Sequence, residues 1–182
     1  MEINSVLKNW SLAFLCLALI SVGTFSYLVS GTDKLSVNKV SVQASGEKKT
    51  TLLSFNPANI TVKKGAEIFV MINIDTNEDS ISAVEAVLSY NPKIIEVADI
   101  TPGSFFEKAS VLEKTINQKK GNVTFALGGI RAKQGKGTVA KIKIKGLQKG
   151  RSNLSLEGSQ AAAVQKSSNV LKETAAGYII VD

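Results

Sequence analysis

The chain is 182 residues long, carries a formal net charge of +7 and contains no histidine. It therefore lacks the side chain that most often serves as a general base near neutral pH, as the base of serine and cysteine triads and as a zinc ligand. Its single cysteine, Cys16, lies in an apolar N-terminal stretch, so the remaining residues can form neither a disulfide nor a thiolate metal site, and the sequence predicts that the protein is not an enzyme.

The first predicted element is the stretch of residues 10–29, which contains no charged side chain. An apolar helix of about 20 residues is long enough to cross the ~30 Å hydrocarbon layer of a membrane. The flanking charges, Lys8 before the stretch and Lys34 and Lys39 after it, do not decide its orientation. We expect residues 1–30 to form a transmembrane signal anchor that holds the rest of the chain outside the cell. The alternatives are a signal peptide whose cleavage releases a secreted protein, and a buried core helix.

A polar segment, residues 31–50, follows and is rich in Ser, Thr and Lys without any sustained apolar period. This composition is typical of a flexible linker. Because the first 31 residues contain only one lysine and one glutamate, the excess of positive charge belongs to the part of the chain that follows them. A basic surface attracts polyanions, although a solvated lysine-rich surface explains the same composition.

Residues 51–182 are predicted to form one all-β domain. Short runs rich in Val, Ile, Leu and Thr recur along this part of the chain, separated by Gly, Asn, Asp or Pro, and no long amphipathic helix competes with them. The runs predict a nine-stranded β-sandwich with strands at residues 51–55, 67–75, 83–90, 93–100, 110–116, 122–127, 138–145, 153–157 and 177–182.

Several of these runs alternate apolar and polar side chains, which is the pattern of a strand buried on one face. In the run at residues 83–90, the side chains predicted to point inward are Val84, Ala86, Leu88 and Tyr90. The outward positions of the same run are Glu85, Val87 and Ser89. The runs at 67–75, 122–127 and 138–145 also carry apolar side chains at every second position, so we expect all four strands to line one core.

The acidic stretch that follows the second run has the D-x-N-x-D spacing with which calcium-binding loops begin. Its candidate ligands are Asp75, Asn77 and Asp79. An EF-hand loop would require glycine at its sixth position and a carboxylate at its twelfth, where this sequence has Ser80 and Ala86. We therefore predict a polar loop without a metal, and keep an irregular calcium site as the alternative.

Residues 128–137, GGIRAKQGKG, are rich in glycine but do not match a Walker phosphate loop, because Ile130 stands where that loop requires its first glycine and Gly137 where it requires Ser or Thr. We predict a flexible loop between two strands. On the next strand, a row of lysines on one face could bind an anion: Lys141, Lys143 and Lys145. No aromatic side chain that could stack on a base lies between them, so we expect no nucleic-acid partner.

The order of these elements resembles that of the cohesin domain, which shares a superfamily with certain cellulose-binding modules. The resemblance covers residues 51–182 and rests on FNPANITVKKGAEIFVMINID, AVEAVLSYNPKIIEVADITPGSFF, GNVTFALGGI, GKGTVAKIKIKGLQKGRSNLSLEGSQAA and the closing GYIIVD. Asn91 stands in LSYNP where cohesins often have aspartate. The resemblance implies a nine-stranded jelly-roll sandwich, without catalytic activity or a cofactor, that binds dockerin modules in extracellular glycan-degrading assemblies.

In cohesins one outer sheet face recognises dockerin, and the resemblance implies that the corresponding residues here are Glu85, Val87, Ser89, Thr124, Ala126, Ser155 and Glu157. We therefore expect a surface-displayed module that binds a dockerin-like protein partner. The alternatives are a carbohydrate-binding module and a structural or adhesive surface domain. Sugar binding on a flat face usually requires exposed aromatic side chains, and Tyr90 and Tyr178 both lie in predicted strands where we expect burial.

Overall fold

The computed structural model describes residues 48–182, so the predicted anchor at residues 10–29 and nearly all of the predicted linker lie outside the described part of the chain. The described residues are all-β, as predicted, and none of them belongs to a helix that could span a bilayer. The strands are β1 (Thr51–Asn56), β2 (Asn59–Val62), β3 (Glu67–Asp75), β4 (Ile81–Ser89), β5 (Ile95–Pro102), β6 (Ala109–Asn117), β7 (Asn122–Lys133), β8 (Lys136–Gly146), β9 (Gly150–Leu154), β10 (Gln160–Ala163), β11 (Leu171–Thr174) and β12 (Gly177–Val181).

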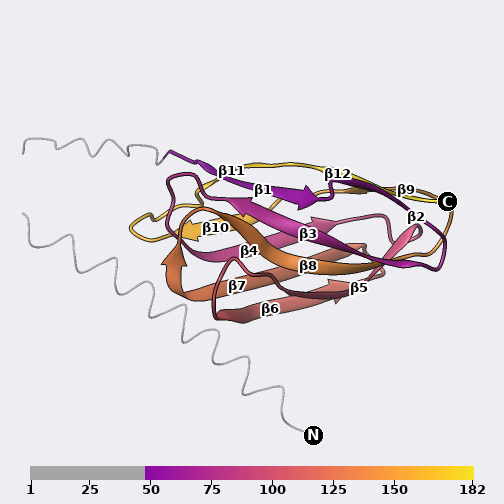
Figure 1. Ribbon diagram of the computed structural model, residues 1–182, viewed down its shortest axis with the longest axis horizontal. Coiled ribbons are helices and arrows are strands. Elements are labelled where there is room, and N and C mark those ends of the chain that lie inside the picture. The colour runs from indigo at the N-terminus through magenta and orange to yellow at the C-terminus, as the bar shows by residue number, and fades with distance from the viewer. Residues whose placement is uncertain (1–47) are drawn as a thin grey trace, which may run out of the picture. The chain divides into compact units, whose positions relative to one another are not determined.

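These strands form two layers (Figure 1). One layer is a five-stranded sheet in the order β11-β1-β3-β8-β5. The other combines a four-stranded sheet, β10-β4-β7-β6, with a three-stranded sheet, β2-β12-β9, and a bridge between Ser89 and Ser155 joins the two. The chain changes layer between β1 and β2, at the cis peptide bond Asn56–Pro57, and again between β11 and β12. Residues 48–182 therefore form a β-sandwich in which both layers contain strands from the beginning and the end of the domain.

The core between the layers consists of every second side chain of the long central strands. On β3 and β8, buried Val70 lies opposite buried Ile142, and on β4 and β7, buried Ala86 lies opposite buried Phe125. Each such side chain stabilises the fold by about 25 cal/mol per Å² of apolar surface removed from water. The predicted inward positions of residues 83–90 are confirmed, including that of Tyr90.

Three strands lie outside the nine predicted runs, so the predicted strand number is wrong. These strands, β2, β10 and β11, are each four residues long, and the sequences of β10 (QAAA) and β11 (LKET) contain few residues with high β propensity. In addition, β2 pairs in parallel with β12, and β11 pairs in parallel with β1. Their hydrogen-bonding partners are distant in sequence, which a local pattern does not reveal.

The glycine-rich segment at residues 128–137 is mostly strand, which corrects the prediction of a flexible loop. β7 continues to Lys133 and β8 begins at Lys136, so only Gln134 and Gly135 separate them. A Cβ atom at Gly129 would lie 2.4 Å from Cδ1 of Phe106. Glycine at this position therefore provides room for a buried ring rather than backbone freedom.

Candidate partner-binding face

The outward face of the sheet β10-β4-β7-β6 gathers most of the residues predicted to bind a partner. On β4, Glu85 lies opposite Ala126 of β7 and Val87 lies opposite Thr124. Because side chains alternate along a strand and the intervening Ala86 is buried, these four side chains point away from the core. We refer to the following outward residues together as the β4–β7 face: Glu85, Val87, Ser89, Thr124, Ala126 and Ser155.

Ser155 joins this face because the chain after β9 runs beside the end of β4. The backbone N–H of Ser89 donates to the carbonyl of Ser155 at 2.9 Å, and the N–H of Ser155 donates to the carbonyl of Ser89 at 3.1 Å. Glu157 is exposed in the connection between β9 and β10, where its N–H donates to Oγ of Ser155 at 3.2 Å. The fold thus brings six of the seven predicted residues together and places Glu157 at their margin.

Two buried serines support this arrangement, and the sequence pattern does not single them out. Between β9 and β10 the chain does not form backbone hydrogen bonds with Val87 of β4. Oγ of Ser159 accepts the hydrogen bond from the N–H of Val87 in their place, at 2.9 Å. Just beyond the end of β4, Oγ of Ser152 accepts a hydrogen bond from the N–H of Asn91 at 2.9 Å. Both serines are buried, so each hydroxyl replaces a backbone acceptor that the irregular strand does not supply.

Leu112 on β6 gives the β4–β7 face an apolar neighbour that sequence reasoning misses. A register shift between Val111 and Glu113 leaves Leu112 as the extra residue of a β-bulge. Its side chain is 64% exposed and lies over Gly128, where a Cβ atom would be 3.3 Å from Cδ1 of Leu112. A depression of about 340 Å³ opens beside it and is also bounded by Glu85 and Ala126. An exposed leucine beside a depression is the type of feature on which a protein partner can be anchored.

Three carboxylates lie on or beside this face without a cationic partner in the described part of the chain. Glu85, Glu113 and Glu157 take part in none of the ion pairs formed within residues 48–182. Glu113 lies opposite Ala126 and therefore shares the outward side of the sheet. Lys166, which also bounds the depression, forms an ion pair with the buried carboxylate of Asp79. The β4–β7 face consequently favours positively charged groups on a partner.

The candidate calcium ligands lie in and beside the connection from β3 to β4 but do not converge on one point. Asp75 forms an ion pair with Lys136 at 2.7 Å, and Asp79 forms one with Lys166 at 2.5 Å. The side-chain amide of Asn77 instead donates at 2.6 Å to a backbone carbonyl that precedes β1. Within residues 48–182, no group of three or more Asp, Glu, Cys or His side chains is placed so that it could hold a metal ion. Two lysine ammonium groups provide the positive charge that these carboxylates face.

Asp79 is the buried member of this group, and its role is structural. The hydroxyl groups of Thr50 and Thr51 donate to its Oδ2 at 2.7 Å and 2.8 Å. Burial alone would raise the pKa of Asp79, but the hydrogen bonds from Lys166 and the two threonines outweigh that effect and hold the pKa below its ordinary value. The ionised carboxylate lies in the connection that precedes β4. It therefore holds together the beginning of β1, including Thr50 of the predicted linker, and Lys166 in the connection that follows β10.

The aromatic side chains relevant to the carbohydrate-binding alternative are mostly covered. Tyr90 is buried and its hydroxyl donates to Oε1 of Gln118. Tyr178 is half-buried, and the guanidinium of Arg151 lies 3.8 Å from its ring centroid, so one face of the ring is occupied. Phe69 on β3 is 60% exposed, but it lies on the five-stranded sheet. One exposed ring does not form the row of aromatic side chains that a flat sugar-binding surface requires.

Comparisons with known proteins point to one family. The model of the cohesin domain matches residues 53–181. No curated protein matches the chain. A similar solved structure is a non-cellulosomal cohesin from the hyperthermophilic archaeon Archaeoglobus fulgidus, with 17% identity, a TM-score of 0.61 and coverage of 72% of this chain and 91% of that one.

Two further similar structures contain a partner. One is a type I cohesin–dockerin complex from Clostridium thermocellum, with 17% identity, a TM-score of 0.59 and coverage of 72% of this chain and 92% of that one. The other is the third cohesin of the protein ScaC from Acetivibrio cellulolyticus in complex with the ScaB dockerin, with 18% identity, a TM-score of 0.60 and coverage of 72% and 99%, respectively. At these identities the likeness concerns the fold.

Proposed function

The chain belongs to the cohesin domain family, and on that premise we propose that it is a non-catalytic module that binds a dockerin-like protein through the β4–β7 face. The observation that carries the proposal is that the sandwich is shared with cohesins from Clostridium thermocellum and Acetivibrio cellulolyticus that were solved in complex with dockerins. The family match supports a binding role, and the absence of histidine from the whole sequence agrees with a module that carries out no acid–base chemistry.

The β4–β7 face is a better candidate for a protein interface than the outward face of the five-stranded sheet. Protein interfaces consist of an apolar centre surrounded by a polar rim, and they are depleted of lysine. Leu112 and Val87 can provide the apolar centre, and Ser89, Thr124 and Ser155 the rim. The opposite sheet instead carries the predicted row of lysines on β8, of which Lys143 is already paired with Glu67 at 2.7 Å.

The chemistry of the face also describes the partner. Glu85, Glu113 and Glu157 have no cationic partner within the described chain, so a complementary surface would present lysine or arginine to them. The depression beside Leu112 would accept an apolar side chain of that partner. Such a partner would associate faster at low ionic strength, because opposite charges steer the encounter.

The proposed module would be displayed on the cell surface by residues 10–29, or secreted if this segment is removed. The length of the uncharged stretch supports an anchor. Mass spectrometry of the N-terminal peptide of the mature protein distinguishes the two forms. Proteolysis of intact cells tests the exposure of the domain: cleavage within residues 48–182 only after lysis would contradict it.

Capture of partners tests the binding proposal. The full-length chain, solubilised in detergent and immobilised, would be exposed to the secreted and surface proteins of the organism that encodes it. We expect a small set of proteins that share one domain type to be retained by the unchanged chain, lost by Glu85→Lys and kept by Glu96→Lys. Both glutamates are half-buried on strands, but Glu96 lies on β5 in the other layer.

Three outcomes would separate the alternatives. Retention of the same proteins by the unchanged chain and by both variants would remove the β4–β7 face as the binding surface. Retention on arrays of neutral polysaccharides, with no protein captured, would favour the carbohydrate-binding alternative; a loss of that retention in Phe69→Ala would support it further, because Phe69 is the most exposed aromatic side chain within residues 48–182. No retention in either assay would leave the structural or adhesive alternative.

A further inference from the structure

One end of the sandwich is formed by connections that are distant in sequence and contact one another. The connection from β2 to β3 meets the end of β8, where the N–H of Gly65 donates to the carbonyl of Gly146 at 2.8 Å. The connection from β8 to β9 meets the connection from β4 to β5, where the N–H of Leu147 donates to the carbonyl of Ile94 at 2.8 Å. These hydrogen bonds make the end one continuous surface.

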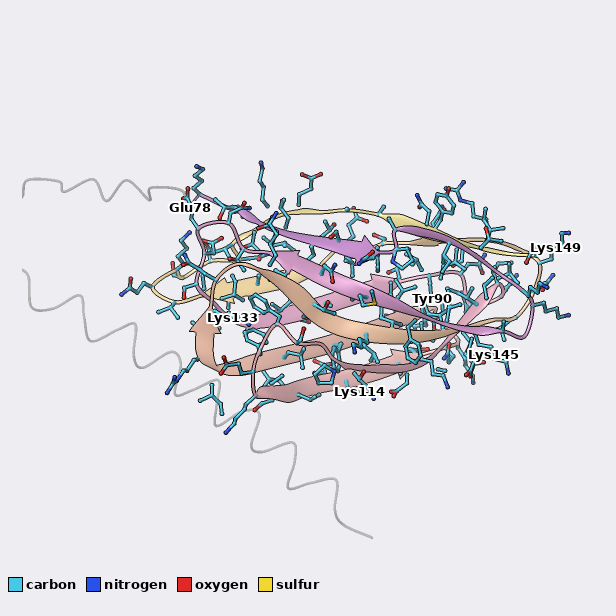
Figure 2. All side chains as sticks on the ribbon, viewed as in Figure 1. Glu78, Tyr90, Lys114, Lys133, Lys145 and Lys149 are labelled. Atoms are coloured by element: carbon cyan, nitrogen blue, oxygen red, sulfur yellow. The ribbon has the colours of Figure 1, made fainter. Side chains whose placement is uncertain are left out.

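This end is rich in positive charge. Six basic residues at this end are together named the distal basic patch: Lys63, Lys64, Lys93, Lys145, Lys149 and Arg151. Figure 2 shows Lys145 and Lys149 at this end of the molecule. Within residues 48–182 none of the six takes part in an ion pair. Lys119 and Lys120 follow on the adjoining turn, which is held to the end of β4 by a hydrogen bond from the N–H of Tyr90 to the carbonyl of Gly121 at 2.8 Å.

Few carboxylates lie near the patch. Glu67 is paired with Lys143, and Glu96 lies opposite Lys145 on the β5–β8 ladder without forming an ion pair. Asp182 lies beside Lys64, whose N–H donates to the backbone carbonyl of Asp182 at 3.0 Å. The cations outnumber these acids, and clustered like charges repel one another, so binding of an anion lowers the electrostatic energy of this end.

We propose that the distal basic patch binds an anionic polysaccharide. The patch is spread over three separate connections and the adjoining turn, so a ligand that neutralises it must carry several charges along its length. The patch contains five lysines and one arginine, and the guanidinium of Arg151 is already stacked on Tyr178 and bonded to Asn153. Lysine acts as a point charge without the bidentate fork that arginine offers to carboxylate or phosphate, so this patch would recognise repeated charges along a polymer rather than the shape of one anionic group.

Other polyanions fit this surface less well. A folded protein partner would require an apolar anchor, and lysine is depleted in such interfaces. Single-stranded nucleic acid would require an aromatic ring free to stack on bases, and Arg151 covers one face of Tyr178 at this end. Duplex DNA needs no stacking, so it is tested directly as a competitor. An acidic polypeptide is more flexible than a chain of linked sugar rings, so it loses more conformational entropy on binding.

The position of the patch keeps it accessible when the chain is attached through its N-terminal residues. The described chain begins at the opposite end of the sandwich, where Thr50 is bonded to Asp79, and Figure 2 places Glu78 and Lys149 at opposite ends. A molecule held through the residues before Thr50 would therefore present the distal basic patch away from its attachment. The inference does not depend on the partner of the β4–β7 face.

Two charge-matched variants of the full-length chain in detergent test the proposal. The patch variant replaces Lys63, Lys64, Lys93 and Lys149 with glutamine. The control variant replaces Lys49, Lys108, Lys141 and Lys172, which are also exposed and unpaired within the described residues. Each variant lowers the formal net charge from +7 to +3, because four lysines are removed (7 − 4). Circular dichroism and melting temperature establish that both variants remain folded.

The probe is immobilised polygalacturonate, with poly-L-glutamate, polyphosphate and duplex DNA as competitors. We expect the patch variant to bind polygalacturonate roughly 10-fold more weakly than the unchanged chain, with a smaller dependence on salt, and the control variant to change by less than about 3-fold. An equal loss in both variants would show that only net charge matters and would overturn the proposal. No binding of the unchanged chain to polygalacturonate, or stronger displacement by any of the three competitors than by free polygalacturonate, would overturn it as well.

Discussion

The ammonium group of Lys166 lies 2.5 Å from Oδ1 of Asp79, whose side chain has no exposed surface. Replacing Lys166 with glutamine would leave the buried carboxylate with only its threonine donors, and a buried charge without its ionic partner is strongly destabilising. We expect Lys166→Gln to reduce the free energy of unfolding by about 2 kcal/mol in denaturant titrations. Lys172→Gln is the control, since Lys172 is exposed and unpaired within the described residues, and a change beyond about 0.5 kcal/mol is not expected there. Equal stability of the two variants would contradict this account.

Stability should decrease in acid because of the same carboxylate. The pKa of Asp79 is lower in the folded chain than its ordinary value of 3.8, so the folded state holds this proton less tightly than the unfolded state does. The contribution of Asp79 to the free energy of unfolding is therefore fully present above the pKa of the unfolded state. It is lost as the pH falls through the pKa of the folded state. We expect the melting temperature to vary little between about pH 7 and 5 and to fall below about pH 4. Asp79→Asn should show a shallower fall, and parallel profiles would assign the acid sensitivity to other groups.

A methyl group at Gly129 should be poorly tolerated. Its Cβ would lie 2.4 Å from Cδ1 of Phe106 and 2.9 Å from the backbone carbonyl oxygen of Arg131. The carbonyl cannot move without shifting β7, so we expect Gly129→Ala to cost about 1–3 kcal/mol. The neighbouring Gly128→Ala is a matched control, because its closest contact is the flexible end of Leu112 at 3.3 Å. Chemical denaturation of both variants measures the difference, and an equal cost would contradict the steric explanation for Gly129.

The hydroxyl of Ser159 should matter more than that of Ser155. Ser159→Ala would leave the N–H of Val87 without its acceptor, and such a loss in a part-buried position costs about 1–2 kcal/mol. The hydroxyl of Ser155 accepts only from the exposed N–H of Glu157, so Ser155→Ala should change stability by less than about 0.5 kcal/mol. Hydrogen exchange of the Val87 amide gives a local readout, and unchanged protection in Ser159→Ala would disprove the proposed role of this bond.

Leu112 should contribute to partner binding and not to stability. Once a partner of the β4–β7 face has been captured, Leu112→Ala should weaken its affinity by about 2 kcal/mol, or roughly 30-fold, because an apolar anchor in the centre of an interface carries a large share of the binding energy. Val111→Ala is the control: Val111 is 48% exposed on the same strand and pairs with inward-facing Leu127. Calorimetric titration compares the variants, and equal affinities would place the interface elsewhere.

The alternation of side chains within single strands was sufficient to predict much of the core and the candidate face. The period of two in β4 and β7 separates Val84, Ala86 and Leu88 from Glu85 and Val87, whichever strands lie beside them. The pairing of β4 with β7 then places Glu85 beside Ala126. Leu112 was missed because a β-bulge interrupts the alternation of β6, and that bulge is defined only by the register with β7.

The sequence by itself determined the all-β class, the central strands, their buried faces and the family, because each of these follows from local alternation or from residues in a recognisable order. The tertiary structure decided which distant residues became partners: Lys166 with Asp79, Ser159 with Val87, and the lysines of separate connections gathered in the distal basic patch. The physical reason is that a strand's inward and outward sides are set within the strand, whereas a hydrogen bond, an ion pair or a shared charged surface depends on which segments the folded layers bring into contact.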